Sequence, residues 1–116
     1  MKITATSDTH GKLPEITGYS DVFIHAGDIA PTFSEDHLTD LVEQTDWSRD
    51  HFEKWISNIS AQYKILLPGN HDLFLLNASY IEYLQKQYNL LIFTKTDVIQ
   101  LHGATFAIYP WTFFPE

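Results

Sequence analysis

Three short polar segments carry residue types that bind divalent metal ions. In chain order they are Ser7-Asp8-Thr9-His10-Gly11, Gly27-Asp28 and Gly69-Asn70-His71-Asp72. Carboxylate oxygens, an amide oxygen and imidazole nitrogens can hold Mn, Fe, Zn or Mg while leaving coordination positions open for a substrate. The segments therefore point to a metal site that could polarise or cleave a bound molecule.

Each segment taken alone has an ordinary explanation. Asp-x-His triplets arise by chance, Gly-Asp is a common turn, and Gly-Asn can form a hairpin corner. Their shared setting is more informative, because each segment follows a short apolar run of the kind that forms a buried strand. Ligands of open α/β sheets bind outside the carboxyl ends of the strands, so the three segments are expected to converge there.

The hydrophobic pattern predicts an α/β protein with the order strand, strand, two helices, strand, helix and three strands. Strands are expected at 2–6, 22–26, 64–67, 90–93, 98–101 and 105–109, the last three as a meander.

Three helices are expected from capping residues and helical spacing. The first is capped by Ser34 and has an apolar face of Leu38, Leu41 and Val42. The second is capped by Ser48 and carries Phe52, Trp55, Ile56 and Ile59. The third is capped by Asn77 and turns Ile81, Leu84 and Tyr88 inward.

Composition narrows the possible functions. A chain of 116 residues with 44% hydrophobic residues suits one domain, here residues 1–116. It has no cysteine, which favours the cytoplasm. No secretory signal or membrane-spanning run is evident, so no membrane partner is expected. The net charge of −8 argues against binding duplex nucleic acid, but bound cations would reverse the local sign for a phosphorylated substrate.

The motif order Asp-x-His, Gly-Asp, Gly-Asn-His-Asp resembles the calcineurin-like metallophosphoesterase superfamily. The segment from Val22 to Asp28 and the later Pro110-Trp111-Thr112 are similar to the subgroup that cleaves cyclic-nucleotide-like phosphodiesters. The resemblance implies a metallophosphoesterase-type β-sandwich flanked by helices. It also implies hydrolysis of a phosphomonoester or phosphodiester, from a phosphorylated small molecule or nucleotide, by a metal-bound hydroxide.

The resemblance also assigns the residues of the site. Asp8 and His10 would ligate a first metal ion, Asp28 would bridge two ions, and Asn70 would ligate the second ion through its side-chain oxygen. His71 would face the leaving group as a proton or hydrogen-bond donor. Asp72 would orient His71.

Family members continue with a further histidine and a Gly-His-x-His loop, and these residues do not occur in this sequence. The chain is therefore expected to be the N-terminal portion of the domain, with one divalent ion rather than two and with a sheet edge free to pair. It could be a fragment of a longer enzyme, a short chain completed by self-association or by a complementing chain, or an inactive binding module.

Other conspicuous residues have structural explanations. His25 lies within an apolar run and is expected to be a core histidine with satisfied hydrogen bonds. The acidic residues between Glu35 and Glu43 are expected to form a solvated helix face. Trp111 is expected to cover the core, with contact to substrate as the alternative.

Overall fold

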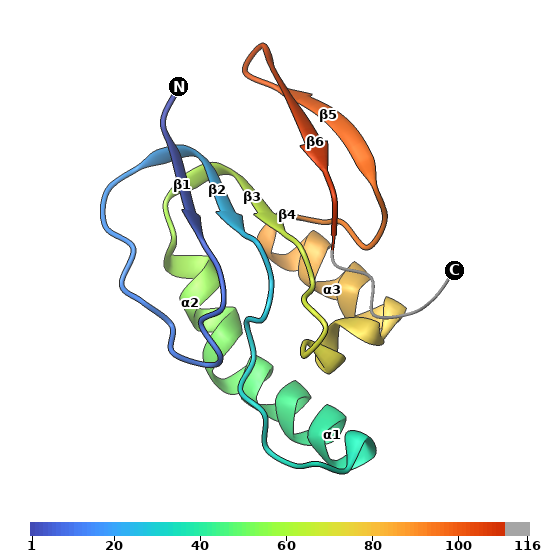
Figure 1. Cartoon of the computed structure of the whole chain (residues 1–116). Helices are drawn as coiled ribbons and strands as arrows, with labels where there is room; N and C mark the ends of the chain where they lie inside the picture. The colour runs from blue at the N-terminus through green and yellow to red at the C-terminus, as the bar shows by residue number, and fades with distance from the viewer. Residues whose placement is uncertain (111–116) are drawn as a thin grey trace.

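The computed structural model of the chain describes residues 1–110. Four parallel strands form the main sheet in the order β1 (Ile3–Thr6), β2 (Ser20–His25), β3 (Ala61–Leu66) and β4 (Leu90–Ile92) (Figure 1). The predicted motif Pro110-Trp111-Thr112, including Trp111, falls largely outside the described residues.

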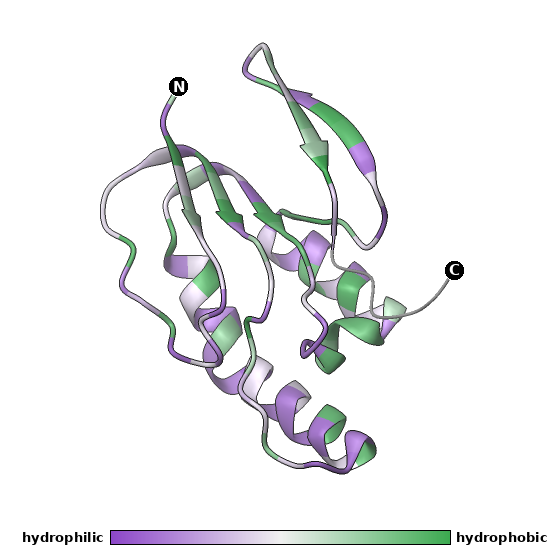
Figure 2. Ribbon diagram, in the orientation of Figure 1, coloured by the Kyte–Doolittle hydropathy of each residue, from purple (hydrophilic) through white to green (hydrophobic). Residues whose placement is uncertain are grey.

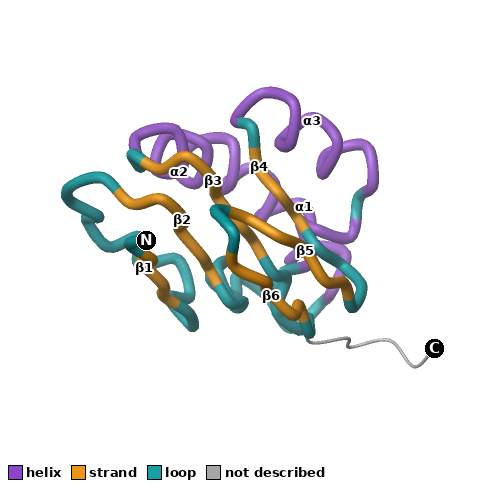
Figure 3. The backbone as a smooth tube through the Cα atoms, turned by 90° about the horizontal axis from the view of Figure 1, so that it is seen from above, coloured by secondary structure: helices purple, strands orange, loops and turns teal. Residues whose placement is uncertain are grey.

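The helices cover one face of this sheet, and a two-stranded hairpin lies on the other face (Figure 3). One helical stretch runs through α1 (His37–Trp47), a π-helical segment (Ser48–Phe52) and α2 (Glu53–Asn58). A 3-10 turn (Leu73–Leu76) precedes α3 (Ala78–Tyr88), and the hairpin consists of β5 (Asp97–Leu101) and β6 (Ala104–Ile108). The predicted α/β class, with helices flanking a sheet, is confirmed.

The predicted meander over the last three strands is wrong. β4 pairs in parallel with β3, with Ile92 opposite Leu66, whereas β5 and β6 pair only with each other among the described strands. The physical reason is the intervening helix, because α3 carries the chain back across the sheet and a crossover of this kind returns a strand in the parallel direction. Only the tight turn between β5 and β6 permits an antiparallel pair.

Two of the three predicted caps are also wrong. Asp36, not Ser34, is the residue before α1, and the Ser34 hydroxyl accepts a hydrogen bond from the Asp36 amide. Ser48 lies inside the continuous helical stretch with helical backbone angles, and its hydroxyl meets the Tyr80 hydroxyl at 2.8 Å. Asn77 is the N-cap of α3 as predicted, and its side-chain oxygen accepts hydrogen bonds from the backbone amides of Ser79 and Tyr80.

The core lies between the sheet and the helices. Phe52 packs edge to face against Phe74, with ring centroids 5.8 Å apart, and its ring lies about 6 Å from the tilted rings of the partly buried Trp47 and Trp55. We call these four residues, Trp47, Phe52, Trp55 and Phe74, the aromatic core. None of the helices formed by residues 1–110 combines the length and apolar character of a membrane span.

α1 departs from the amphipathic helix that its sequence predicts. Leu38 and Val42 are 74% and 60% exposed, whereas Asp40 and Gln44 are buried. Figure 2 shows the mainly hydrophilic character of this helix. The predicted solvated face is therefore wrong at Asp40, whose carboxylate accepts a hydrogen bond from the Phe33 amide at 2.8 Å. The helix buries polar groups because they satisfy the backbone of neighbouring loops.

Candidate metal centre

The three polar segments lie at one edge of the sheet, where β1, β2 and β3 end (Figure 1). Parallel pairing brings these ends together, since Thr6 lies opposite His25 and His25 lies opposite Leu66. We call the loops that follow, residues 7–11, 26–31 and 67–72, the loop edge. The convergence that the sequence predicts is therefore present in the structure.

Asp8, His10 and Asp28 form a cluster that can hold a cation. Each side chain offers one ligand atom, and these three atoms lie within 4.8 Å of one another. Two carboxylates and one imidazole suit Mn, Fe, Zn or Mg, and three protein ligands leave positions for water or substrate. The donor set thus fits a divalent ion, which the charge of both carboxylates would favour.

All three clustered residues adopt a backbone conformation that side chains disfavour. Their φ angles are 54° for Asp8, 48° for His10 and 55° for Asp28. Such angles are uncommon for non-glycine residues, although Asp and His adopt them more often than most, and they recur in turns and at functional sites. Here the two loops are tied side by side, because the Asp8 amide donates to Gly27 O at 2.8 Å and the His10 amide donates to Asp28 O at 3.0 Å.

The third loop packs closely against Asp28 because Gly69 has no side chain. A Cβ atom at Gly69 would lie 2.2 Å from Asp28 Oδ1 and 2.3 Å from the Asp28 amide nitrogen. The His71 amide donates to the same Oδ1 at 3.2 Å. Any larger residue at position 69 would therefore push the Asn70 loop away from the Asp28 carboxylate.

Asn70 and His71 both border the cluster. Asn70 lines a hollow of about 280 Å³ together with Asp8 and Asp28. The His71 ring centroid lies 6.1 Å from that of His10. These positions agree with the sequence predictions for the two residues, although their roles as ligand and proton donor stay predictions.

Asp72 is buried, and its carboxylate joins two loops. Oδ1 accepts from the amides of Ile29 and Ala30 at 2.8 and 2.9 Å, and Oδ2 accepts from the Gly69 amide at 2.8 Å. Burial raises the pKa of this carboxyl group, and the hydrogen bonds that it accepts from the three backbone amides oppose that rise. No hydrogen bond between Asp72 and the His71 ring occurs among residues 1–110. Its predicted role in orienting His71 stays a prediction, and its contacts indicate that it fixes the loops.

Gln44 is a supporting residue that the sequence analysis missed. Its side-chain nitrogen donates to His71 O at 2.8 Å and to Pro31 O at 3.1 Å, and its oxygen accepts from the Phe74 amide. One glutamine of α1 thus ties the second loop, which carries Asp28, to the third loop, which carries His71. Nothing in its helical spacing distinguishes it from a solvent-facing residue, so only the tertiary contacts reveal this function.

His25 is a buried histidine that positions the first loop, as the sequence predicts for a core histidine. Nδ1 accepts from the Gly27 amide at 3.1 Å, so the neutral ring carries its proton on Nε2, which lies 2.9 Å from Thr9 Oγ1. Burial lowers the pKa of His25 to about 4, against the opposing effect of the Asp8 and Asp28 charges. With both nitrogens engaged, His25 is no metal ligand here.

The fold and this edge define an α/β protein with a candidate metal-binding cluster between adjacent strand ends. The family described as calcineurin-like phosphoesterase matches residues 1–113. The chain therefore belongs to the calcineurin-like phosphoesterase family. This family uses divalent metal ions and acts on phosphorylated substrates.

Curated relatives show the same likeness over a shorter span. The chain is 36% identical over 73 residues to metallophosphoesterase domain-containing protein 1 of Homo sapiens. The aligned residues make up 62% of this chain and 19% of the human protein. The Mus musculus protein of the same name matches equally. A probable rhamnogalacturonate lyase C of Emericella nidulans is 28% identical over 75 residues, 65% of this chain and 6% of that protein. The chain thus spans about a fifth of the length of the first two relatives.

Proposed function

We propose that the protein hydrolyses a phosphomonoester or phosphodiester with the help of a divalent cation held by Asp8, His10 and Asp28. The observation that carries this proposal is the clustering of the three ligand atoms within 4.8 Å at the edge where three parallel strands end. Membership in the calcineurin-like phosphoesterase family supports the reaction class.

The side chains of the loop edge have complementary tasks in this proposal. When bound, a divalent cation would activate water and neutralise charge on the phosphoryl oxygens. Asp8, His10 and Asp28 would hold that cation, with Asn70 as a further oxygen ligand from the neighbouring loop. His71 would donate a proton or hydrogen bond to the departing oxygen, since its ring lies 6.1 Å from the ring of His10. Asp72 would keep the second and third loops in register.

The test measures metal binding and hydrolysis separately. The chain is stripped with a chelator, Mn²⁺ binding is followed by calorimetry, and hydrolysis of bis(4-nitrophenyl) phosphate is measured after Mn²⁺ is restored. Asp28→Asn should weaken Mn²⁺ binding and lower hydrolysis by at least about 100-fold, because a carboxylate shared by the cluster is lost.

A matched control is available on α1. Glu43→Gln removes one exposed carboxylate of α1 that does not belong to the cluster. This variant should change neither Mn²⁺ binding nor hydrolysis. Equal hydrolysis by wild type and Asp28→Asn would contradict the proposed function. Hydrolysis that persists in the chelated wild-type chain would contradict its metal dependence.

A further inference from the structure

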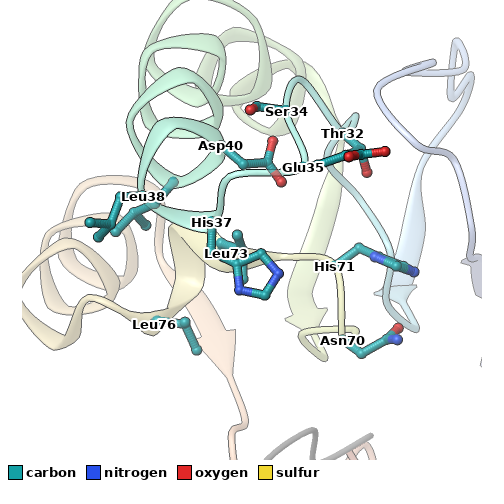
Figure 4. Close-up of a pocket in the computed structure, with 11 residues that line it drawn as sticks. Thr32, Ser34, Glu35, His37, Leu38, Asp40, Asn70, His71, Leu73 and Leu76 are labelled. Atoms are coloured by element: carbon teal, nitrogen blue, oxygen red, sulfur yellow. The ribbon is translucent and has the colours of Figure 1, made fainter.

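A second hollow, of about 520 Å³, adjoins the candidate metal centre (Figure 4). It lies between the start of α1 and the 3-10 turn, and four leucine side chains line it: Leu38, Leu41, Leu73 and Leu76. We call it the leucine groove. Its volume falls in the range of about 300–1,000 Å³ that accommodates organic ligands.

The leucine groove and the metal centre share residues. Asn70 lines both the groove and the smaller hollow that contains Asp8 and Asp28. His71 lines the groove, and its ring lies 6.1 Å from the His10 ring. A molecule whose phosphoryl group lies at the cluster can therefore extend past Asn70 and His71 into the groove.

The exposure of the leucines indicates that the groove is adapted to an apolar ligand. Leu38 is 74% exposed and Leu76 is 52% exposed, although both are large apolar side chains. Exposed apolar side chains grouped beside polar residues mark binding surfaces. α1 contributes to this group by leaving Leu38 exposed while it buries Asp40 and Gln44.

The charges of the groove restrict the ligand further. Glu35 and Asp40 line it, and none of its described lining residues is a lysine or an arginine. A second phosphate or carboxylate on the ligand would meet the like charges of these two carboxylates, with no lysine or arginine in the described lining to pair with. The groove therefore suits a neutral group rather than a polyphosphate chain.

We propose that the leucine groove binds the alcohol portion of the phosphoester, and that this portion is a neutral apolar or aromatic group. The inference rests on the proposed function, because it assumes that the phosphoryl group lies at the cluster. In this arrangement His71 lies at the border between the phosphoryl group and its apolar substituent, where the ester oxygen must be.

The experiment compares two phosphonates that cannot be hydrolysed, benzylphosphonate and methylphosphonate, by calorimetry on the Mn²⁺-loaded chain. Both carry the same anionic head, so only the ring differs. The wild-type chain should bind benzylphosphonate about 10-fold more tightly, because the buried ring contributes apolar area that is partly offset by the cost of ordering.

Variants locate the ring. Leu38→Gln and Leu76→Gln replace exposed side chains, so folding should be retained, and each should reduce the preference for benzylphosphonate at least about 3-fold while methylphosphonate affinity is unchanged. Val42→Gln is the matched control, because Val42 is 60% exposed on the same helix but does not line the groove. It should keep the full preference.

The possible failures are distinguishable. The proposed role of the leucine groove would be overturned if the wild type bound the two phosphonates equally. It would also be overturned if the preference for benzylphosphonate survived in both leucine variants. If neither phosphonate binds, the proposed function fails, and benzyl alcohol titrated into the metal-free chain then tests the groove by NMR. Shifts confined to the methyl groups of Leu38, Leu73 and Leu76 would support it, and their absence would overturn it.

Discussion

The aromatic core and the loop edge are built from opposite kinds of contact. Between the sheet and the helices, the rings of the aromatic core pack around Phe52 without a hydrogen bond between them. At the strand ends, buried polar groups such as Asp72 and Gln44 hold the backbone of separate loops. The two regions are joined by one helical stretch, whose first part supplies Gln44 and whose later part supplies Phe52.

This difference shows how one domain separates stability from ligand geometry. Apolar packing is nondirectional and contributes mainly through buried area, so it stabilises the fold as a whole. Hydrogen bonds are directional and fix the positions of particular atoms, at modest net gain in stability. The loop edge can therefore hold Asp8, His10 and Asp28 in disfavoured backbone conformations while the aromatic core supplies the free energy that maintains them.

The largest effect on stability is expected in the aromatic core. Phe52→Ala should lower the free energy of unfolding by about 3–5 kcal/mol in a urea titration, because it removes a fully buried ring and leaves a cavity. Ile56→Val, a milder change at another buried position, should cost about 0.5–1.5 kcal/mol and keep Mn²⁺ affinity unchanged. Weaker Mn²⁺ binding by folded Ile56→Val would show that the two regions are not separable.

A change at the loop edge should weaken Mn²⁺ binding as well as stability, unlike a change in the aromatic core. Asp72→Asn keeps the side-chain shape but places an amide group where carboxylate oxygens accept from three backbone amides. The free energy of unfolding should fall by about 2 kcal/mol, and Mn²⁺ affinity should fall about 10- to 100-fold as the loops shift. If Asp72 only orients His71, hydrolysis would fall while Mn²⁺ affinity measured by calorimetry stays at the wild-type level.

The pH dependence of stability should report on His25 at the same edge. Its folded pKa of about 4 lies below the ordinary value of 6.5, so the unfolded chain binds the proton more readily. This contribution to stability is complete above about pH 6.5 and is lost as the pH falls toward 4. By linkage, the metal-free chain should lose about 2 kcal/mol between pH 8 and pH 5 from this residue.

The measurement compares urea titrations of the wild type and His25→Asn at the two pH values. The variant should be less stable at pH 8 and should show a smaller loss on acidification. His51→Ala, which removes an exposed imidazole from the long helical stretch, serves as the control and should retain the wild-type pH dependence. A loss that is identical in wild type and His25→Asn would assign the effect to other groups.

Prediction from sequence succeeded where local pattern and tertiary structure agree. The strands predicted at 2–6 and 22–26 are present as β1 (Ile3–Thr6) and β2 (Ser20–His25), and Asn77 caps α3. Prediction failed at α1, where the apolar pattern indicated that Leu38 and Val42 face inward. Periodicity reports which side chains share a helix face, but not whether that face meets the sheet or polar loops that need hydrogen bonds.

The strand pairing in the last third of the chain also could not be predicted from the local sequence pattern. Leu90–Ile92 reads as one more apolar strand, and its parallel place beside β3 follows from the path of α3 over the sheet. Neighbouring runs in sequence need not be neighbours in a sheet, since pairing depends on contacts between distant segments. The same limit hid Gln44, whose partners lie 13 to 30 residues away in the chain.

Residue type and local spacing were enough to predict the α/β class, the three polar segments and their order after successive strands. Only the tertiary structure brought Asp8, His10 and Asp28 within 4.8 Å and turned Asp72 and Gln44 into ties between loops. The physical reason is that a ligand cluster depends on distances between segments, which no local preference fixes and which the parallel sheet and its buried hydrogen bonds set together.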